Sequence, residues 1–309
     1  MHFFHTPKNS INQSLGDVDG HSIVVKREDL THPIVSGNKF RKLKYEFQQV
    51  LNRDIPLVIT YGGAFSNHLA ATAALGKMLG VQTLGIVRGE EWQTKISEST
   101  TLFYCQQQGM QLYCVSRTSY SQKESAEEVQ QILKKKIKYK LIPEGGTTPL
   151  AIRGCTEILN DKDLSFDVVC VSVGTGGTLI GLSKAAREAQ RILGFNALNN
   201  SSVENFISSQ SDVSNWEINS DYTFGGYAKT TPTLITFMNT FYQQYKIPLD
   251  PVYTGKMLFA IFDLIKSGKW KWGKRILVIH TGGLQGIAAM NHQLQKKQYP
   301  LISYQKDLL

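Results

Sequence analysis

The sequence lacks several features that would place the protein in a specialised class. No apolar run in its 309 residues is long enough to cross a bilayer. The first residues do not follow the charged, apolar and small-residue order of a secretory signal. Its four cysteines are scattered, with no Cys-x-x-Cys pair and no metal-ligand spacing. We therefore expect a cytoplasmic protein with reduced core cysteines, no metal site and no membrane contact.

Negative charge is also scarce, since 25 Asp and Glu residues oppose 34 Lys and Arg residues. The net charge of +9 makes a nucleic-acid binder an alternative to consider. The densest basic run, 134–140, lies at the end of a predicted helix, where cations are favourable, and no recognition motif accompanies it. We therefore expect no nucleic-acid partner. The positive charge suits an enzyme whose cofactor and substrate are anions.

What the sequence does contain is an alternation of short β-branched runs with helical stretches. Apolar strands that do not alternate with polar residues, each followed by a helix, indicate parallel sheets covered on both faces. The right-handed crossover rule then predicts doubly wound α/β layers. An Asn- and Ser-rich segment, 199–220, is expected to hold a surface loop around a short helix. The predicted strands are 57–60, 81–87, 111–115, 139–142, 167–173 and 275–279, and the predicted helices include 66–79, 125–136, 177–193 and 287–294.

Polar clusters lie at or beside the predicted strand-to-helix junctions, where α/β sheets bind ligands. In the first cluster, Lys39 and Lys42 lie three residues apart near the start of a predicted helix, with Ser36 as the expected N-cap. The alternative is a solvated basic helix start. Burial and the helix dipole would both lower the pKa of a lysine placed there, which suits a lysine that reacts as a neutral amine.

Two glycine-rich turns form the next clusters. In the turn 60–68, Ser66 can cap a helix and also offer its hydroxyl and the nearby N–H groups to a carboxylate, although a capped turn without a ligand is an equal alternative. The second turn presents successive N–H groups and two hydroxyls as a phosphate cradle. A dinucleotide site fits it less well, because Leu179 replaces the last glycine of the fingerprint. Its residues are Gly174, Thr175, Gly176, Gly177 and Thr178.

The fourth cluster is the segment 251–256, which contains Tyr253 and Thr254, and we group with it Tyr227, another tyrosine beside glycine. The last cluster follows the last predicted strand and contains Thr281 and Gly282. With all of these motifs in order, the chain resembles the branch of fold-type II pyridoxal-phosphate enzymes that holds 1-aminocyclopropane-1-carboxylate deaminase and D-cysteine desulfhydrase. The resemblance covers nearly the whole chain. Its most diagnostic segments are Gly-Asn-Lys-x-Arg-Lys, Ser-Asn-His and Pro-Val-Tyr-Thr-Gly-Lys.

The resemblance implies a role for each of these residues. Lys39 is the expected Schiff-base lysine of pyridoxal 5′-phosphate, and Lys42 and the loop 174–178 are expected to hold its phosphate. Asn67 is the expected partner of the ring hydroxyl, and Thr254 that of the pyridine nitrogen. The expected substrate-binding residues are Ser66, Asn67, His68, Thr281 and Gly282, and the expected catalytic residues are Lys39, Ser66, Tyr227 and Tyr253.

The resemblance also implies architecture and activity. We expect two doubly wound three-layer domains like those of the tryptophan synthase β subunit, a large one from 1–47 plus 161–309 and a small inserted one from 48–160. The expected assembly is a homodimer. A threonine at 254 and at 281 matches the desulfhydrases, which predicts β-elimination from D-cysteine to pyruvate, ammonia and sulfide. The alternatives are deamination of the cyclopropane amino acid to 2-oxobutyrate and ammonia, and a low-turnover cofactor-binding protein.

Overall fold

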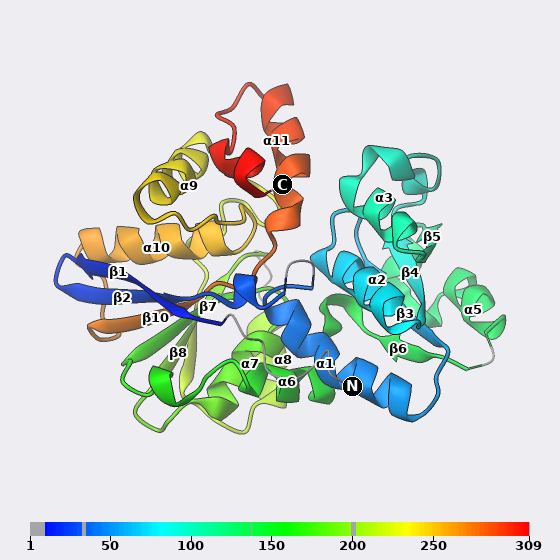
Figure 1. Ribbon diagram of the computed structural model, residues 1–309, viewed down its shortest axis with the longest axis horizontal. Coiled ribbons are helices and arrows are strands. Elements are labelled where there is room, and N and C mark those ends of the chain that lie inside the picture. Colours follow the sequence, from blue (N-terminus) through cyan, green and yellow to red (C-terminus); the bar gives the residue numbers. More distant parts are fainter. Residues whose placement is uncertain (1–9, 33–34, 137, 199–201, 309) are drawn as a thin grey trace.

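The computed structural model describes residues 10–32, 35–136, 138–198 and 202–308, which form two lobes (Figure 1). Each lobe is built around its own β-sheet. Among these residues the larger sheet has six strands, in the order β1 (Asn12–Val18), β2 (His21–Lys26), β10 (Arg275–Ile279), β7 (Val168–Val173), β8 (Arg191–Asn196) and β9 (Trp216–Asn219). The smaller sheet has four, in the order β5 (Gln111–Val115), β4 (Gln82–Arg88), β3 (Leu57–Gly62) and β6 (Lys140–Ile142).

Helices cover both faces of the larger sheet, because its central strands are apolar on both sides. In β7, Val168 and Cys170 pack toward one face, and Val169 and Val171 pack toward the other. A strand buried on both faces has no solvent side, which is why β7 appears in the sequence as an unbroken apolar run. The first face packs against α9 (Pro232–Tyr245), α10 (Thr254–Lys266) and α11 (Ile287–Lys296), and the second against α6 (Pro149–Thr156), α7 (Gly177–Ala185) and α8 (Ser202–Gln210).

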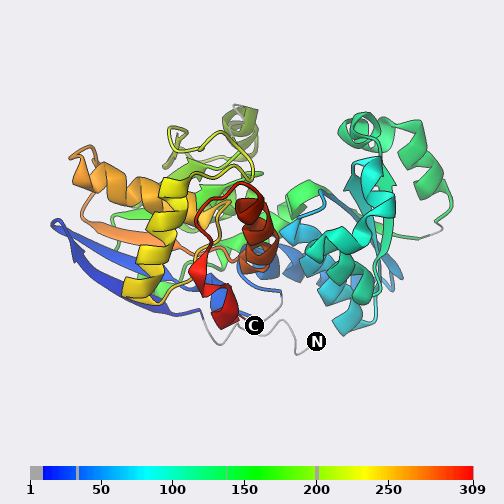
Figure 2. The same cartoon turned by 90° about the horizontal axis from the view of Figure 1, so that it is seen from above.

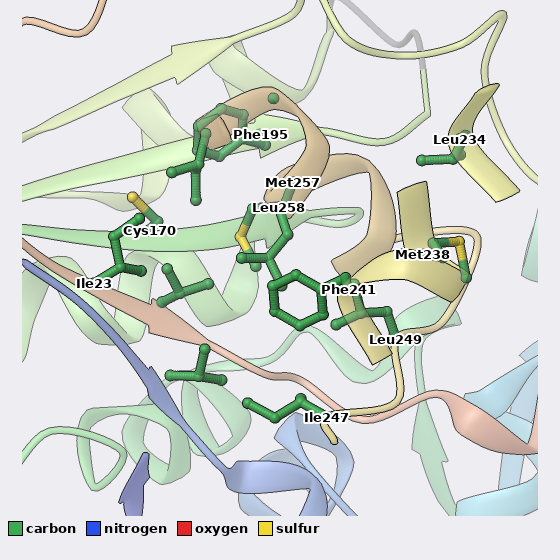
Figure 3. Close-up of a cluster of buried hydrophobic side chains, with 14 of the residues drawn as sticks. Ile23, Cys170, Phe195, Leu234, Met238, Phe241, Ile247, Leu249, Met257 and Leu258 are labelled. Carbon is green, nitrogen blue, oxygen red and sulfur yellow. The ribbon is translucent and has the colours of Figure 1, made fainter. Parts of the chain in front are cut away.

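The largest buried cluster holds α9 and α10 on this sheet (Figure 3). Phe195 of β8 and Ile23 of β2 meet Met257 and Leu258 of α10 and Phe241 of α9. All five side chains are buried, and each contributes about 1.5–3 kcal/mol on burial. The cluster therefore fixes α10 against the sheet, and with it the residues at the start of α10 that reach the site described below.

The smaller sheet is parallel throughout, with β3 between β4 and β6. Its strand C-terminal ends therefore share one edge, and Arg88 and Glu144 at that edge line a cavity with residues of the larger lobe. One face of the sheet packs against α2 (Asn67–Leu79) and α3 (Thr100–Gln107), and the other against α4 (Arg117–Gln122) and α5 (Glu127–Lys134).

The helix α1 (Asn38–Asn52) joins the lobes, which lie side by side in both views (Figures 1 and 2). Phe40 and Phe47 pack into the small-lobe core. On its other side α1 touches α6 so closely that a Cβ added at Gly154 would lie 1.9 Å from the Arg41 carbonyl oxygen. The Arg41 guanidinium donates to the buried Glu28 carboxylate at 2.8 and 2.9 Å. The predicted domain boundary at 47/48 falls inside this helix, and the boundaries stay a prediction.

The predicted α/β class is confirmed, and two predicted strands, 111–115 and 275–279, match β5 and β10 residue for residue. The helix predicted over 177–193 is wrong in its second half. It ends at Ala185, and the apolar run that begins at Ile192 pairs with β7 as strand β8. The antiparallel β1–β2 hairpin at the sheet edge was not predicted. The segment 199–220 contains α8 and the edge strand β9, and its residues 199–201 lie outside the described part.

Two absences hold for the described residues. They include no helix long and apolar enough to cross a membrane. They also include no group of three or more His, Cys, Asp or Glu side chains that could hold a metal ion. The four cysteines are unpaired, and three of them, Cys105, Cys155 and Cys170, are buried as predicted.

Candidate active site

The N-terminus of α1 lies against the turn that follows β10. Gly37 precedes the helix with a φ of +65°, and a Cβ at this position would lie 2.0 Å from the Thr281 carbonyl oxygen. The amide of Asn38 donates to the same carbonyl at 3.3 Å. The prediction that Ser36 caps this helix is therefore wrong. The close approach of the turn requires glycine at the cap position.

Lys39 lies in the first turn of α1 with few partners. Among the described residues its Nζ reaches one acceptor, Asn38 Oδ1, at 3.3 Å. Burial, and then the charge of Lys42, lowers the pKa of Lys39 to about 7, while the charge of Asp250 opposes the shift. A large share of Lys39 is therefore a neutral amine at neutral pH. This is the form that attacks a carbonyl group.

Lys42, one turn further along α1, is instead fully hydrogen-bonded. Its Nζ donates to the Gly145 carbonyl at 2.9 Å, to Thr147 Oγ1 at 3.2 Å and to Thr175 Oγ1 at 3.4 Å. The two hydroxyls share a hydrogen bond of 2.7 Å, so one hydroxyl hydrogen stays free for another acceptor. Burial lowers the pKa of Lys42, and no described carboxylate is paired with it. An anion bound here would compensate the buried ammonium.

The glycine loop 174–178, between β7 and α7, lies beside these groups. A Cβ at Gly177 would lie 2.8 Å from Thr147 Oγ1. Gly176 has a φ of +83°, and a Cβ there would lie 2.7 Å from Cγ1 of Ile207. The loop therefore has no side chain at these two positions to cover its backbone. The first amides of α7 have no acceptor within the helix and are available to a ligand. Together with Lys42, these groups form an anion cradle of the kind a phosphate needs.

The turn between β3 and α2 supplies a second set of donors. Ser66 is the N-cap of α2, as predicted, and its Oγ accepts from the Leu69 amide at 3.3 Å. The helix ends at Leu79, as predicted, and Gly80 is its C-cap. The amides of Asn67 and His68 lie in the first turn and have no acceptor within the helix. This arrangement suits a carboxylate, because the helix dipole favours negative charge there.

His68 is buried, and its partners determine its tautomer. The Thr60 hydroxyl donates to the Ile142 carbonyl at 2.8 Å, so its 2.8 Å hydrogen bond with His68 is donated by Nε2 of the imidazole. Nδ1 then carries the lone pair and has no partner among the described residues. Burial, followed by the charges of Lys39 and Lys42, lowers the pKa of His68 well below its ordinary value. A neutral His68 can donate to a carboxylate through its backbone amide but not through Nδ1.

A hydrogen-bonded cap begins α10. The carboxylate of Asp250 accepts from the amides of Val252 and Tyr253 at 3.0 Å, from the amide of Thr254 at 2.8 Å and from Thr254 Oγ1 at 2.7 Å. The hydroxyl hydrogen of Thr254 is thus committed to Asp250, and Thr254 is fully buried. A pyridine nitrogen would have to compete with Asp250 for that hydrogen. The role of Thr254 toward the nitrogen stays a prediction.

The two tyrosines singled out in the sequence face one cavity. Tyr253 follows Asp250 at the start of α10, and Tyr227 lies on the loop after β9 with 47% of its surface exposed. Burial, and then Tyr227 and Asp250, raises the pKa of Tyr253 well above its ordinary value. The pKa of Tyr227 is also raised, first by burial of its hydroxyl region and then by Asp250 and Glu144. Both hydroxyls therefore stay protonated and can donate.

The loop that carries Tyr227 is strained and anchored. Phe224 and Ala228 on either side have φ of +53° and +55°, a conformation that costs non-glycine residues about 1–3 kcal/mol. Lys256 of α10 is buried and donates to the carbonyls of Gly226 at 2.7 Å and Thr223 at 2.8 Å. The helix α10 therefore positions both tyrosines, one through its own first turn and the other through this ammonium.

A cavity of about 690 Å³ lies between the lobes, and most of the predicted site residues line it or its narrow extension toward Lys42. Two do not. Thr254 is committed to the α10 cap, and Gly177 lies behind the loop against Thr147. The lining residues among those predicted are Lys39, Lys42, Ser66, Asn67, His68, Gly174, Thr175, Gly176, Thr178, Tyr227, Tyr253, Thr281 and Gly282.

Sequence reasoning missed Thr147, Asp250 and Lys256. Thr147 follows a pair of glycines after β6, so the strand-to-helix rule that found the other turns would have found it as well. Asp250 directly precedes Pro251, a position where a carboxylate can cap the turn that follows. No local signal marks Lys256 as the anchor of a loop about 30 residues away.

An anion cradle and a neutral lysine on one helix are what a phosphorylated aldehyde cofactor requires, and the first turn of α2 lines the same cavity. The fold and the site together define a pyridoxal-phosphate enzyme of fold type II that acts on amino acids. Residues 2–282 match the family described as "Pyridoxal-phosphate dependent enzyme", and the chain belongs to this family. Its cofactor is pyridoxal 5′-phosphate.

Known relatives narrow the family further. The chain is 32% identical to a putative 1-aminocyclopropane-1-carboxylate deaminase of Pyrococcus horikoshii, over 86% of each chain. It is 29% identical to a bifunctional D-cysteine desulfhydrase/1-aminocyclopropane-1-carboxylate deaminase of Arabidopsis thaliana, over 87% of this chain and 74% of that protein. The crystal structure of an ACC deaminase homologue superposes with a TM-score of 0.81 and 27% identity, over 94% of each chain. The protein is thus a homologue of the deaminases and desulfhydrases.

Proposed function

We propose that the protein is a lyase that eliminates sulfide from D-cysteine, giving pyruvate and ammonia. One observation carries the proposal: the narrow part of the cavity, around Lys39 and Lys42, has hydroxyl groups and no carboxylate among its described lining residues. Thr281 lines this cavity, and its hydroxyl has no described hydrogen-bond partner. The Asp250 carboxylate, which lines the adjacent cavity, already accepts four hydrogen bonds.

The residues present fit the cofactor. Lys42, with the glycine loop and the hydroxyls of Thr147 and Thr175, would hold its phosphate, and Asn67 its ring hydroxyl. Lys39 would hold it covalently, since its pKa of about 7 leaves it a reactive amine. When bound, pyridoxal phosphate supplies an electron sink that stabilises negative charge on the substrate Cα.

The remaining steps use groups of this chain. The amides of Asn67 and His68, with the Ser66 hydroxyl, bind the substrate carboxylate and so orient Cα. Lys39 Nζ takes the proton from Cα, and its lowered pKa keeps it neutral and able to do so. Tyr227 and Tyr253 stay protonated and stand ready to donate to the leaving sulfur.

The choice between elimination and ring opening follows from the partner of the ring nitrogen. A carboxylate keeps that nitrogen protonated and makes the ring a strong electron sink, which breaking a carbon–carbon bond demands. A threonine hydroxyl, that of Thr254 or of Thr281, donates to an unprotonated nitrogen and leaves a weaker sink. The weaker sink is sufficient when a thiolate leaves from Cβ. A hydroxyl-lined cavity therefore favours the desulfhydrase reaction.

The test compares sulfide release from D-cysteine with 2-oxobutyrate formation from the cyclopropane amino acid under matched conditions, with Lys39→Ala as the blank. We expect sulfide and pyruvate in equal amounts and a much slower cyclopropane reaction. Abundant 2-oxobutyrate with negligible sulfide would instead assign the deaminase activity. Bound cofactor with neither product would indicate a low-turnover binding protein.

A further inference from the structure

A second, smaller cavity opens beside the cofactor cavity. Asn67 and Tyr253 line both. The smaller cavity has a volume of about 40 Å³, which is room for about three water-sized groups. Its walls come from both lobes, because Phe65 belongs to the turn before α2 while Ala289 and Met290 belong to α11.

The small cavity offers no partner for a charge. Asp250 is the single carboxylate on its described lining, and both of its oxygens already accept hydrogen bonds from the α10 cap. No lysine or arginine is among the described residues that line it. The large cavity differs, since Arg88 and Glu144 line it and Glu144 pairs with Lys123 at 2.8 Å. A charged group that entered the small cavity would lose its hydration without compensation.

The small cavity adjoins the carboxylate site through Asn67. Asn67 takes part in both, with its backbone amide in the first turn of α2 and its side chain beside the cavity. A Cβ added at Gly283, on the cavity wall, would lie 2.9 Å from Asn67 Nδ2 and 3.3 Å from Asp250 Cγ. An amino acid held by its carboxylate at α2 can therefore direct its side chain into this space.

We propose that this cavity binds the substrate side chain, so that the enzyme accepts amino acids with uncharged side chains of up to about three non-hydrogen atoms. The inference rests on the proposed function, since it assumes an amino acid whose carboxylate lies on α2. Phe65 from the small lobe and Ala289 from the large lobe set the limit. Phe65 is itself held by an edge-to-face contact with Trp92, with ring centroids 5.5 Å apart, so its ring forms a fixed wall.

The experiment measures dissociation constants of the cofactor-loaded protein from its visible absorbance, using both enantiomers of alanine, 2-aminobutyrate, norvaline and norleucine, with aspartate as the charged member. We expect affinity to rise roughly fourfold for each added methylene, from about 0.8 kcal/mol per buried CH₂, up to norvaline. Norleucine should bind no better than norvaline, because its side chain has one atom more than the cavity holds. Aspartate should bind more weakly than 2-aminobutyrate.

Variants on the two walls separate the cavity from other sites. Ala289→Val adds two carbons to the lining and should weaken norvaline binding roughly tenfold while leaving alanine unchanged. Ala288→Val, the same substitution one position earlier in α11 and off the cavity lining, is the matched control and should change neither. Phe65→Ala should let norleucine bind more tightly than norvaline, provided that circular dichroism shows a folded protein.

Each outcome decides something. Equal affinities along the series, an unchanged series in Ala289→Val, or preference for aspartate would overturn the inference, the last because it would direct the side chain to Arg88. A chain-length series of the expected form without sulfide release from D-cysteine would overturn the proposed function and leave the cavity assignment standing. No absorbance response to any amino acid would overturn both.

Discussion

The two ends of the cofactor cavity are built on one helix and yet differ in how their lysines are bonded. Lys42, at the phosphate end, donates to three acceptors at 2.9–3.4 Å. Lys39, one turn earlier, has one described acceptor at 3.3 Å. Burial lowers the pKa of both. The phosphate end is therefore preorganised around an anion. At the reactive end, the Lys39 amine has to give up only one long hydrogen bond to a described residue before it can react.

The other polar side chains at the two ends differ in the same way as the two lysines. At the reactive end His68 Nδ1 has no described partner, and the pKa of Tyr253 is raised. At the phosphate end the hydroxyls of Thr147 and Thr175 are already paired with each other. The binding groups of the phosphate end are thus held in place by one another, whereas the reacting groups have few described partners or none.

The largest effect should come from removing the reactive end altogether. Lys39→Ala should lose covalent cofactor attachment and at least about a thousandfold in turnover, while the phosphate end still binds the cofactor without a covalent bond. Borohydride reduction of the loaded parent followed by peptide mapping should find the adduct on Lys39, and equilibrium dialysis should find the cofactor retained in the variant. An adduct on Lys42 would show that Lys42, and not Lys39, is the reactive lysine.

Removing the other lysine should weaken binding and leave the fold intact. Lys42→Met loses charge-assisted hydrogen bonds worth about 1.5–3 kcal/mol, so the dissociation constant for pyridoxal phosphate should rise about 10- to 100-fold. The melting temperature should change little, since an apolar group of similar volume replaces a buried charge. Pyridoxal, which lacks the phosphate, is the control ligand and should bind parent and variant alike.

A glycine-loop variant is a less clean probe of the phosphate end. The sequence suggests that Gly176→Asp weakens cofactor binding far more than folding. In the structure Gly176 has a φ of +83° and its Cβ would lie 2.7 Å from Ile207, so the variant also strains the backbone and repacks α8. Thr175→Val, which removes one hydroxyl without changing the backbone, avoids that cost and should raise the dissociation constant several-fold.

The pH dependence of cofactor attachment tests the charge state of the reactive end. Because the pKa of Lys39 is lowered from 10.5 to about 7, the attachment rate of apoprotein should rise about tenfold per pH unit below 7 and level off above it. Stopped-flow absorbance measures this, with pyridoxal as a control for phosphate ionisation. In Lys42→Met the midpoint should move upward, since the Lys42 charge is the second cause of the shift. An unchanged midpoint would show that the Lys42 charge does not lower the pKa of Lys39.

The same shift has a consequence for the stability of the apoprotein. Between pH 7 and 10.5 the unfolded chain binds a proton at Lys39 that the folded chain does not. The contribution of this group to the free energy of unfolding therefore rises with pH across that window and is lost as the pH falls toward 7.

The smallest effect should come from the hydroxyl that orients His68. Thr60→Val leaves the Ile142 carbonyl and His68 Nε2 without their partner, at a cost of about 1–3 kcal/mol in stability. Turnover should fall less than tenfold, since His68 binds through its backbone. Thr72→Val, on the same side of the small lobe, is the matched control, because the buried Thr72 hydroxyl has no described partner. A melting temperature lowered equally in both variants would contradict the assigned role of Thr60.

The sequence by itself determined the α/β alternation, the cap at Ser66, the glycine loop and the two lysines on one helix. These follow from local rules of periodicity, capping and turn chemistry, in which each residue acts on neighbours a few positions away. The resemblance added residue roles that periodicity alone does not supply, such as those of Asn67 and Tyr253.

Only the tertiary structure decided the rest, because the deciding partner lies far away in the chain. Thr281 makes Gly37, and not Ser36, the cap of α1. Strand β7 turns the end of a predicted helix into β8. Lys42 meets its acceptors 103 to 133 positions away, and no local pattern encodes such a contact. Packing of separate segments, with the burial that follows, also lowers the pKa of Lys39, because desolvation depends on everything that surrounds a charge and not on its neighbours in sequence.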